Sequence, residues 1–470
     1  MRKLLLTFAL CCAPMATGGP IRAPQSGPAP FDHVSSSREV AGEEENNAFV
    51  TWAKSHAQTI NSPEPGTDLA DLAAMNDVVG SARIVGVGES IHGIHEFLGL
   101  RLRMVQFLVE KMGFTSVALE SGLPESKMVY DYVLGGEKPP NLWSDGFTWH
   151  MSIFGETRDL VEWMRSYNLN PSHKRKIRFY GMDVAGGNGT WVPALNRLFA
   201  YLDRVEPVYA KDIRERLLPL AEKFARPGFS SAEFVAANNA YSALPLNDRN
   251  AIAAYSNELA DRLEELRLPY INASSEEEYD WARQIAINLR YASAMLVNYE
   301  ARERGNALWN ARDLAMAVNV RWMRGRDGQG GGVVVLAHNG HVQTQTSSKV
   351  AANAACLGIF LRATVGDDYR NVGFTFNRGT MWGGEPGEPK PLPEAAADTI
   401  DRALARVGPS LYFVNLRLIS PESAARNWLD RQIKQRIQDL STEYNQYRSW
   451  DGLIFVDVIT PSHLAKPENP

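Results

Sequence analysis

The chain has 470 residues, of which 44% are hydrophobic and 22% are charged, and its formal net charge is −5. These values are those of an ordinary globular protein and exclude a wholly disordered chain. The negative charge argues against a protein that binds nucleic acid by neutralising phosphates. No stretch reaches the roughly 18 apolar residues that a membrane-spanning helix needs, so we expect no membrane span.

The N-terminus has the pattern of a secretory signal peptide. Arg2 and Lys3 precede the apolar stretch 4–13, which is too short to span a membrane, and small residues follow it. We therefore expect residues 1–19 to be removed and the protein to be periplasmic or secreted from a bacterium. A buried N-terminal helix is the alternative interpretation.

The chain has three cysteines. Cys11 and Cys12 leave with the predicted signal, unless one of them is lipidated. Cys356 then stands alone, which excludes a disulfide framework and a cysteine metal site. We expect Cys356 to be a small residue of the core.

Residues 20–45 are rich in proline, glycine, serine and charge, which predicts a flexible linker. A helical pattern begins near Asn47. Strands and helices then alternate, which predicts βαβ units and a largely parallel sheet. The expected strands are 83–88, 115–119 and 177–182, and the expected helices are 94–112 and 156–167.

A long region without a convincing strand interrupts this alternation. Its expected helices are 206–225, 231–242, 248–267, 276–299 and 308–324. Further strands are expected at 332–337, 371–376, 411–416 and 453–458, with helices near 395–407 and 421–440. We therefore predict an α/β catalytic core, 46–192 and 325–470, that carries a helical insertion or cap, 193–324.

Four predicted core strands each end in ionisable residues. These are Glu89 and His92 after the first strand, Glu120 after the second, Asp183 after the third, and His338 and His341 after the fourth. In open α/β sheets, ligands bind outside the carboxyl ends of the strands. We therefore expect these side chains to converge on one crevice.

These residue types suggest a mechanism. His92 lies at a strand-to-helix turn and, with an ordinary pKa of about 6.5, can take a proton from water near neutral pH. Glu89 or Glu120 would hold its tautomer and stabilise the imidazolium. Arg101 is expected to lean back along its helix toward the crevice, where it would stabilise an oxyanion or fix a carboxylate. His338 and His341 are three residues apart, so one helical turn would place both on one side.

Several familiar motifs are absent. The chain has neither the Gly-x-Ser-x-Gly elbow of serine hydrolases nor a Walker A loop. His95-Glu96 does not complete a zinc-protease motif, because Gly99 stands where the second histidine is needed. Without an obvious nucleophile, we expect direct attack by an activated water.

The segment Gly88-Glu-Ser-Ile-His-Gly-Ile-His-Glu-Phe97 resembles the signature of the erythromycin esterase family. The resemblance covers about 70–460 and continues through Arg101, 113–114, 118–120, 180–183, 312–319 and 337–342. It implies a three-layer α/β/α hydrolase fold with a helical insertion. It also implies hydrolysis of an ester, in the best-known members the macrolactone of erythromycin-type antibiotics, without a covalent acyl-enzyme.

The resemblance also implies residue roles. The base falls on His92, and the other catalytic positions fall on Glu89, Glu120, Arg101, His338 and His341. We further expect Asp183, Arg312 and His95, which lie in the matched segments, to bind the substrate. Two positions depart from the family pattern: Ile91 stands where threonine is common, and Gly340 where alanine is common.

We thus expect an exported ester hydrolase with a small-molecule substrate and no cofactor or bound metal. Arg101 near the crevice would repel a divalent cation and supply positive charge in its place. Two alternatives stay open: a metal-dependent hydrolase that uses the same His/Glu cluster, and a non-catalytic protein that binds haem or a metal.

Overall fold

The computed structural model describes residues 32–465 apart from 229–230, 301–306, 329, 346–353 and 384–386. The predicted signal peptide 1–19 and the first part of the predicted linker lie outside the described residues.

Nine strands of the described residues form one sheet, in the order β1-β8-β11-β6-β2-β5-β3-β4, with β7 paired to β6. The strands are β1 Gln58–Thr59, β2 Ile84–Val87, β3 Ser116–Gly122, β4 Arg178–Asp183, β5 Val333–Leu336, β6 Tyr369–Trp382, β7 Pro389–Leu392, β8 Leu411–Asn415 and β11 Gly452–Ile459. The run from β11 to β4 is parallel, whereas β1, β7 and β8 pair antiparallel. The sheet is therefore mostly parallel, and each strand expected from the sequence is present.

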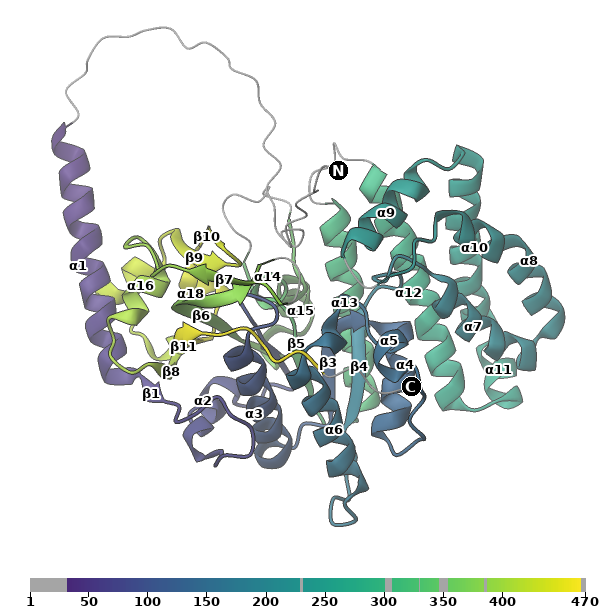
Figure 1. The fold of residues 1–470 in the computed structure, drawn as a ribbon, viewed down its shortest axis with the longest axis horizontal. Coiled ribbons are helices and arrows are strands. Elements are labelled where there is room, and N and C mark those ends of the chain that lie inside the picture. The colour runs from purple at the N-terminus through teal and green to yellow at the C-terminus, as the bar shows by residue number, and fades with distance from the viewer. Residues whose placement is uncertain are drawn as a thin grey trace, which may run out of the picture.

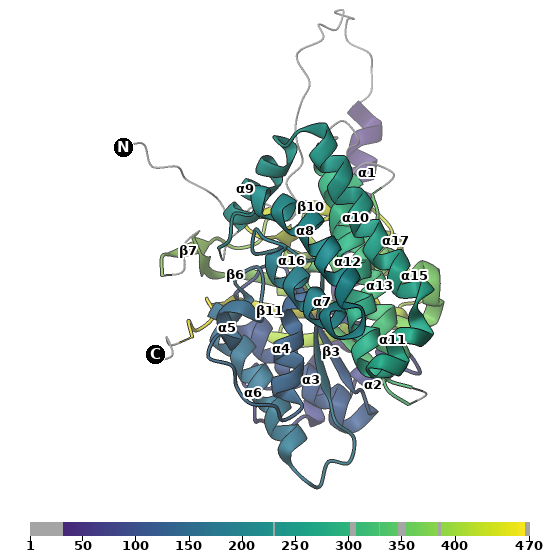
Figure 2. The same ribbon diagram turned by 90° about the vertical axis from the view of Figure 1, so that its right-hand side faces the viewer.

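The central strands form because they are short, wholly buried apolar runs. All four residues of β2 and of β5 are buried, as expected of parallel strands that are covered on both faces. Alternate residues enter two different cores: Ile84 belongs to one, and Val85 and Val87 belong to the other. The sheet thus lies between two apolar layers, and the three-layer α/β/α prediction is confirmed (Figures 1 and 2).

One layer is built by helices from the first part of the chain. These are α2 Met75–Val79, α3 His95–Met112, α4 Leu123–Val133, α5 Leu142–Asp145 and α6 Gly155–Leu169. In Figure 1, α2, α3 and α6 lie below the sheet. The opposite layer contains α1 Asp32–His56, α14 Asn339–Val342, α15 Leu357–Val365, α16 Ile400–Ala405 and α17 Ala424–Leu429, together with the long helices that follow β4.

The helices after β4 lie beside that edge strand (Figure 1). They are α7 Val192–Val205, α8 Pro207–Phe224, α9 Ser231–Ser242, α10 Leu246–Glu265, α11 Arg267–Ala273, α12 Glu276–Glu300 and α13 Ala307–Arg326. The five helices expected here are confirmed, and α7 and α11 are additional. The last helix, α13, packs against β3, β4 and β5, so it covers the sheet itself. The division into core and cap stays a prediction.

Two expectations differ from the structure. Helix α1 begins at Asp32, so part of the predicted linker is helical, because the prolines stop at Pro30 and helix-forming residues follow. The helix expected at 421–440 ends with α17. It is followed by a hairpin of β9 Ile433–Ile437 and β10 Leu440–Tyr444, then by α18 Gln446–Ser449. Buried residues alternate along β9, which is a strand period, and Gln438 turns the chain with a φ of 55°.

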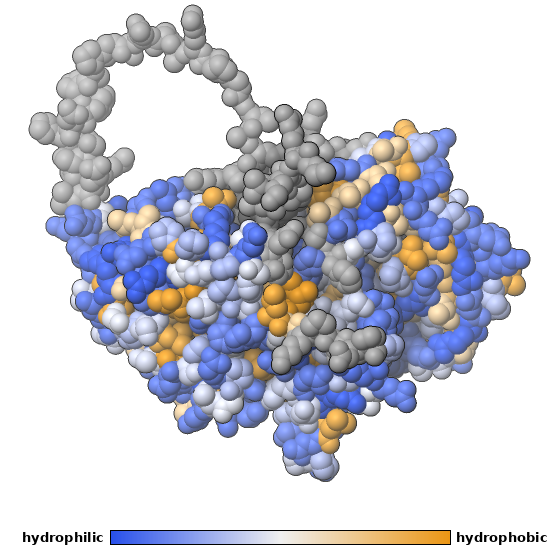
Figure 3. Space-filling model, in the orientation of Figure 1, coloured by the Kyte–Doolittle hydropathy of each residue, from blue (hydrophilic) through white to orange (hydrophobic). Residues whose placement is uncertain are grey.

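The face seen in Figure 3 is mainly hydrophilic, with small scattered hydrophobic patches. Among the described helices, none is long and apolar enough to cross a membrane.

Candidate active site

The sheet brings the expected strand ends together. Strands β2, β5, β3 and β4 are adjacent and parallel, so the residues after their carboxyl ends lie along one edge. His92 and His338 follow β2 and β5, Asp183 ends β4, and Glu120 lies in the last three residues of β3. The side chains that were expected to converge therefore lie together. We call this group the strand-end cluster: Glu89, His92, Arg101, Glu120, Asp183, Arg312, Asp313, His338 and His341.

His92 is the least buried histidine of this cluster. Its Nδ1 lies 2.7 Å from Oε1 of Glu89, and its side chain is 15% exposed whereas that of Glu89 is 2% exposed. The carboxylate holds the proton on Nδ1, which places the lone pair of the neutral ring on Nε2. This is the tautomer that a general base needs.

Gly93 shapes the turn that carries His92. Its φ is +69°, a conformation that residues with a Cβ rarely adopt, and a Cβ at this position would lie 2.6 Å from the Phe154 ring. The turn after β2 therefore needs glycine for both its backbone and its packing.

Arg101 fixes Glu89 rather than reaching an open crevice. Its Nη1 lies 2.8 Å from Oε1 of Glu89, and the side chain is 3% exposed. Its remaining hydrogen bonds run to backbone carbonyls: Nε donates to Gly88 at 3.0 Å, and Nη2 donates to Val87 at 3.2 Å and to Ala337. Of the two predicted roles, the geometry supports fixing a carboxylate. Arg101 is thus a positioning residue that ties the ends of β2 and β5.

Glu89 is stabilised as an anion. Burial alone would raise the pKa of its carboxyl, but Arg101 and His92 outweigh burial and lower it. An ionised Glu89 beside His92 favours the imidazolium that forms when the ring takes up a proton.

The other two histidines of the cluster, His338 and His341, have opposite protonation states. His338 accepts a hydrogen bond from the Gly340 amide at Nδ1, at 3.1 Å, and its Nε2 donates to the Ser90 carbonyl at 3.1 Å. Burial, with His92 nearby at 5.0 Å between ring centroids, lowers the pKa of His338 to about 3. His338 is therefore neutral, with both ring nitrogens engaged by the backbone.

His341 lies between two carboxylates. Its Nδ1 is 2.7 Å from Asp313, and its Nε2 is 3.1 Å from Glu120. Burial alone would lower the pKa of His341, but Asp313 and Glu120 outweigh burial and raise it well above its usual range. The ring is an imidazolium, so its 3.1 Å approach to Nη1 of Arg312 is a contact between two donors that share Glu120.

Arg312, from α13, joins the ends of β3 and β4. Its Nη2 lies 2.6 Å from Asp183 and 2.9 Å from Glu120, and these side chains are at most 2% exposed. Asp183 also accepts from Nε1 of Trp149 at 2.8 Å. Burial would raise the pKa of Glu120, but His341 and Arg312 hold it well below the usual range. The placement of Arg312 and Asp183 is that of a buried ion pair, and their predicted substrate binding stays a prediction.

The charges of the strand-end cluster favour uptake of one proton. The cluster contains three cations, Arg101, Arg312 and imidazolium His341, and four carboxylates, so one negative charge is left without a matching cation before His92 is counted. Protonation of His92 makes the cluster neutral. In a buried site this compensation supports a base at His92.

Asp313 and Trp149 were not predicted to belong to the site. Asp313 stands beside Arg312 in a segment that carries the family resemblance, so that segment was the available signal. Trp149 lies in a loop with a φ of +59°, and no sequence pattern marks it.

His95 lies apart from the strand-end cluster. Its Nδ1 is 2.7 Å from Glu156 and its Nε2 is 2.8 Å from Glu64, while its ring packs on His463. The hydrogen bond that His95 donates to Glu156 is the main cause that raises the pKa of His95 to about 9. These contacts do not place His95 with the other predicted site residues, so its substrate binding stays a prediction.

The strand-end cluster is poorly suited to a metal ion, because its carboxylates are already bonded to arginine or to imidazolium. Among the described residues, the histidines and carboxylates spaced to hold an ion are those of His95, Glu156 and His463. This geometry disfavours the alternative in which the strand-end cluster itself binds a metal.

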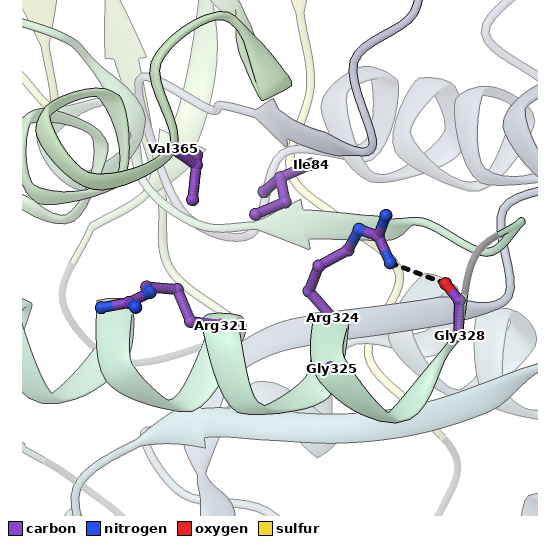
Figure 4. A pocket seen from close by; sticks show the side chains of 6 residues that line it. All are labelled: Ile84, Arg321, Arg324, Gly325, Gly328 and Val365. Carbon is purple, nitrogen blue, oxygen red and sulfur yellow. Dashed lines mark hydrogen bonds between the residues drawn. The ribbon is translucent and has the colours of Figure 1, made fainter.

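A separate hollow of about 380 Å³ is drawn in Figure 4. It is lined by Ile84, the first residue of β2, and by Arg321 and Arg324, and Arg324 donates to the Gly328 carbonyl at 2.8 Å. Because Ile84 marks the amino end of β2, the hollow lies away from the carboxyl ends of the strands and does not belong to the strand-end cluster.

A buried acid beside the cluster gives a pH-dependent prediction. Glu125, in the first turn of α4, is 4% exposed, and burial raises the pKa of its carboxyl to about 7. Between pH 4.5 and 7 the folded protein keeps a proton that the unfolded chain loses, so this group increasingly destabilises the fold as pH rises. We expect Glu125→Gln to stabilise the protein by about 3 kcal/mol at pH 8 and by little at pH 4.5.

Urea unfolding of both proteins across this pH range measures the difference in the free energy of unfolding. A difference that does not change with pH would show that Glu125 does not titrate in this way.

Comparisons with known proteins identify the family. The family model described as erythromycin esterase matches residues 109–459. Erythromycin esterase type II from Escherichia coli is 25% identical over 332 residues, which are 70% of this chain and 77% of that protein. Erythromycin esterase type I from Escherichia coli is 28% identical over 137 residues, which are 29% of this chain and 31% of that protein.

The solved structures show the same fold. A Bacillus cereus protein has a TM-score of 0.77 at 24% identity, covering 90% of this chain and 99% of that one. An erythromycin esterase mutant in its open conformation has a TM-score of 0.69 at 19% identity, covering 87% and 99%. Because the family model spans most of the chain, this protein belongs to the erythromycin esterase family of ester hydrolases.

Proposed function

We propose that the protein hydrolyses a small-molecule ester by direct attack of a water that His92 activates. The observation that carries this proposal is the 2.7 Å hydrogen bond from Nδ1 of His92 to a buried Glu89. It makes His92 a base with a fixed tautomer, and His92 is also the cluster histidine whose side chain remains partly exposed.

In the proposed reaction, Nε2 of His92 takes one proton from water while the water oxygen adds to the ester carbonyl carbon. The tetrahedral oxyanion then collapses, and the bond between the carbonyl carbon and the alcohol oxygen breaks. The imidazolium returns its proton to the leaving alkoxide. One water is consumed, a carboxylic acid and an alcohol form, and His92 is again neutral.

The positioning residues keep this base in place through the cycle. Glu89 holds the ring orientation and stabilises the transient imidazolium, and Arg101 holds Glu89. His338 packs against His92 as a neutral ring, so it adds no second positive charge when His92 is protonated.

We propose a macrolactone as the substrate class, supported by the relatives named erythromycin esterase. We also propose that catalysis needs no metal, because the cationic groups of the cluster occupy the carboxylates that would bind one. Export through residues 1–19 is part of this proposal.

The test is a panel of macrolides and simple esters. They are incubated with protein from which metal ions were removed by a chelator and dialysis, and the products are analysed by mass spectrometry. We expect at least one macrolide to gain the mass of one water. We also expect no acyl adduct on the intact protein and no burst of product, because water attacks directly.

An acyl adduct would contradict the direct attack, and turnover of simple esters alone would contradict the macrolactone. If activity is lost on chelation while circular dichroism shows that the protein stays folded, and one stoichiometric divalent ion restores it, metal-dependent hydrolysis would be favoured.

A further inference from the structure

The C-terminal segment 460–465, which we call the strap, crosses the starts of α3 and α6. The His95 amide donates to Thr460 at 2.9 Å, and the Ser462 amide donates to Gly93 at 2.9 Å. The Gly155 amide donates to His463 at 2.7 Å. The strap therefore lies against the turn that carries His92.

Three side chains converge where the strap passes these helices. His95 begins α3, Glu156 is in the first turn of α6, and His463 belongs to the strap. One ligand atom from each lies within 4.8 Å of the other two. Oε1 of Glu156 is 2.7 Å from Nδ1 of His95 and 3.2 Å from Nδ1 of His463.

These separations suit a metal ion. With metal–ligand bonds of about 2.1 Å, neighbouring ligands around a tetrahedral ion lie about 3.4 Å apart, so small shifts would admit one. Two imidazoles and one carboxylate are a donor set that Zn²⁺ accepts.

A second carboxylate is placed as metal sites commonly place it. Oε1 of Glu64 lies 2.8 Å from Nε2 of His95. Metal-binding histidines usually donate their other ring N–H to such a carboxylate, which fixes the ring and makes it more basic. Without a cation, both nitrogens of His95 must carry protons to satisfy the two carboxylates, and an ion at Nδ1 replaces one of them.

A further observation points to a missing ligand. Glu156 is 5% exposed, and among the described residues its Oε2 has no hydrogen-bond partner although it is buried. A buried carboxylate oxygen without a partner is costly unless something binds it. The ring of His463 is 76% exposed and borders a hollow of about 550 Å³, so an ion can reach the site.

We propose that His95, Glu156 and His463 bind one divalent transition-metal ion of the Zn²⁺ class, which holds the strap against α3 and α6. The fourth position is left to water. The site is distinct from the strand-end cluster, and its ion stabilises the fold rather than activating the catalytic water.

The test uses the untagged full-length protein after chelation, with Zn²⁺ added in calorimetric titration and Co²⁺ as a spectroscopic probe. We expect one ion per chain, a rise in Tm with added Zn²⁺ because the ion binds the folded state, and visible Co²⁺ absorption from the nitrogen and oxygen ligands.

His463→Ala is the main variant, because this exposed side chain can be removed without opening the core. We expect it to weaken Zn²⁺ binding by at least about tenfold and to abolish the Tm rise. His173→Ala, which removes a histidine that contacts Tyr167 instead, is the matched control and should bind like the parent protein. Glu156→Gln should repeat the His463 result.

The proposal is overturned if the parent protein binds no Zn²⁺, or if His463→Ala binds as tightly as His173→Ala. These readouts do not involve ester turnover, so they are independent of the proposed catalysis.

Discussion

Replacing His92 by alanine is expected to lower kcat by about 10²–10⁴-fold while the protein stays folded, because the general base is lost. The side chain is 15% exposed, so the space that its removal leaves is open to solvent. Steady-state kinetics on the ester substrate measure the loss, and circular dichroism with thermal unfolding verifies the fold. His173→Ala removes an imidazole outside the cluster and should keep full activity.

Glu89→Gln makes this prediction more specific. Glutamine still accepts the hydrogen bond from Nδ1 of His92 but no longer stabilises the imidazolium. The acidic limb of the kcat/KM profile should therefore move to lower pH, which a purely structural effect would not produce. Near-full activity of His92→Ala, or an unmoved acidic limb in Glu89→Gln, would contradict the base assignment.

The parts of the fold that follow from local pattern were predictable. Runs such as Ile84–Val87 and Val333–Leu336 are apolar throughout, and this marks strands that are covered on both faces. The convergence of residues at the strand ends then follows from parallel order alone. The reach of Arg101 to Glu89 also follows from a local rule, because helical side chains lean toward the N-terminus.

The parts that depend on distant contacts were not predictable. His338 and His341 look equivalent in the sequence, yet one is neutral and the other is charged. The difference comes from Asp313, 28 positions earlier on α13, and from backbone groups that saturate the ring of His338. His95 is in the same signature as His92, but Glu156, which is 61 positions away, holds it elsewhere.

Arg312 offers the largest expected effect on stability. Arg312→Met removes the cation that neutralises Asp183 and Glu120. Both carboxylates are at most 2% exposed, so they stay buried and lose their positive partner. Removing one partner of a buried ion pair lowers the free energy of unfolding by about 3–5 kcal/mol, because the remaining charge stays buried and unpaired. Urea unfolding at neutral pH should show a loss of this size.

The matched control is Arg204→Ala, which breaks a pair whose side chains are 56% and 42% exposed and should cost less than about 1 kcal/mol. Arg312→Met combined with Asp183→Asn removes one of the two unpaired carboxylate charges and should recover part of the lost free energy of unfolding. If Arg312 serves only to bind substrate, Arg312→Met would instead raise KM and leave the free energy of unfolding near that of Arg204→Ala. The two outcomes separate a residue that binds the ester substrate from one that joins α13 to the carboxyl ends of β3 and β4.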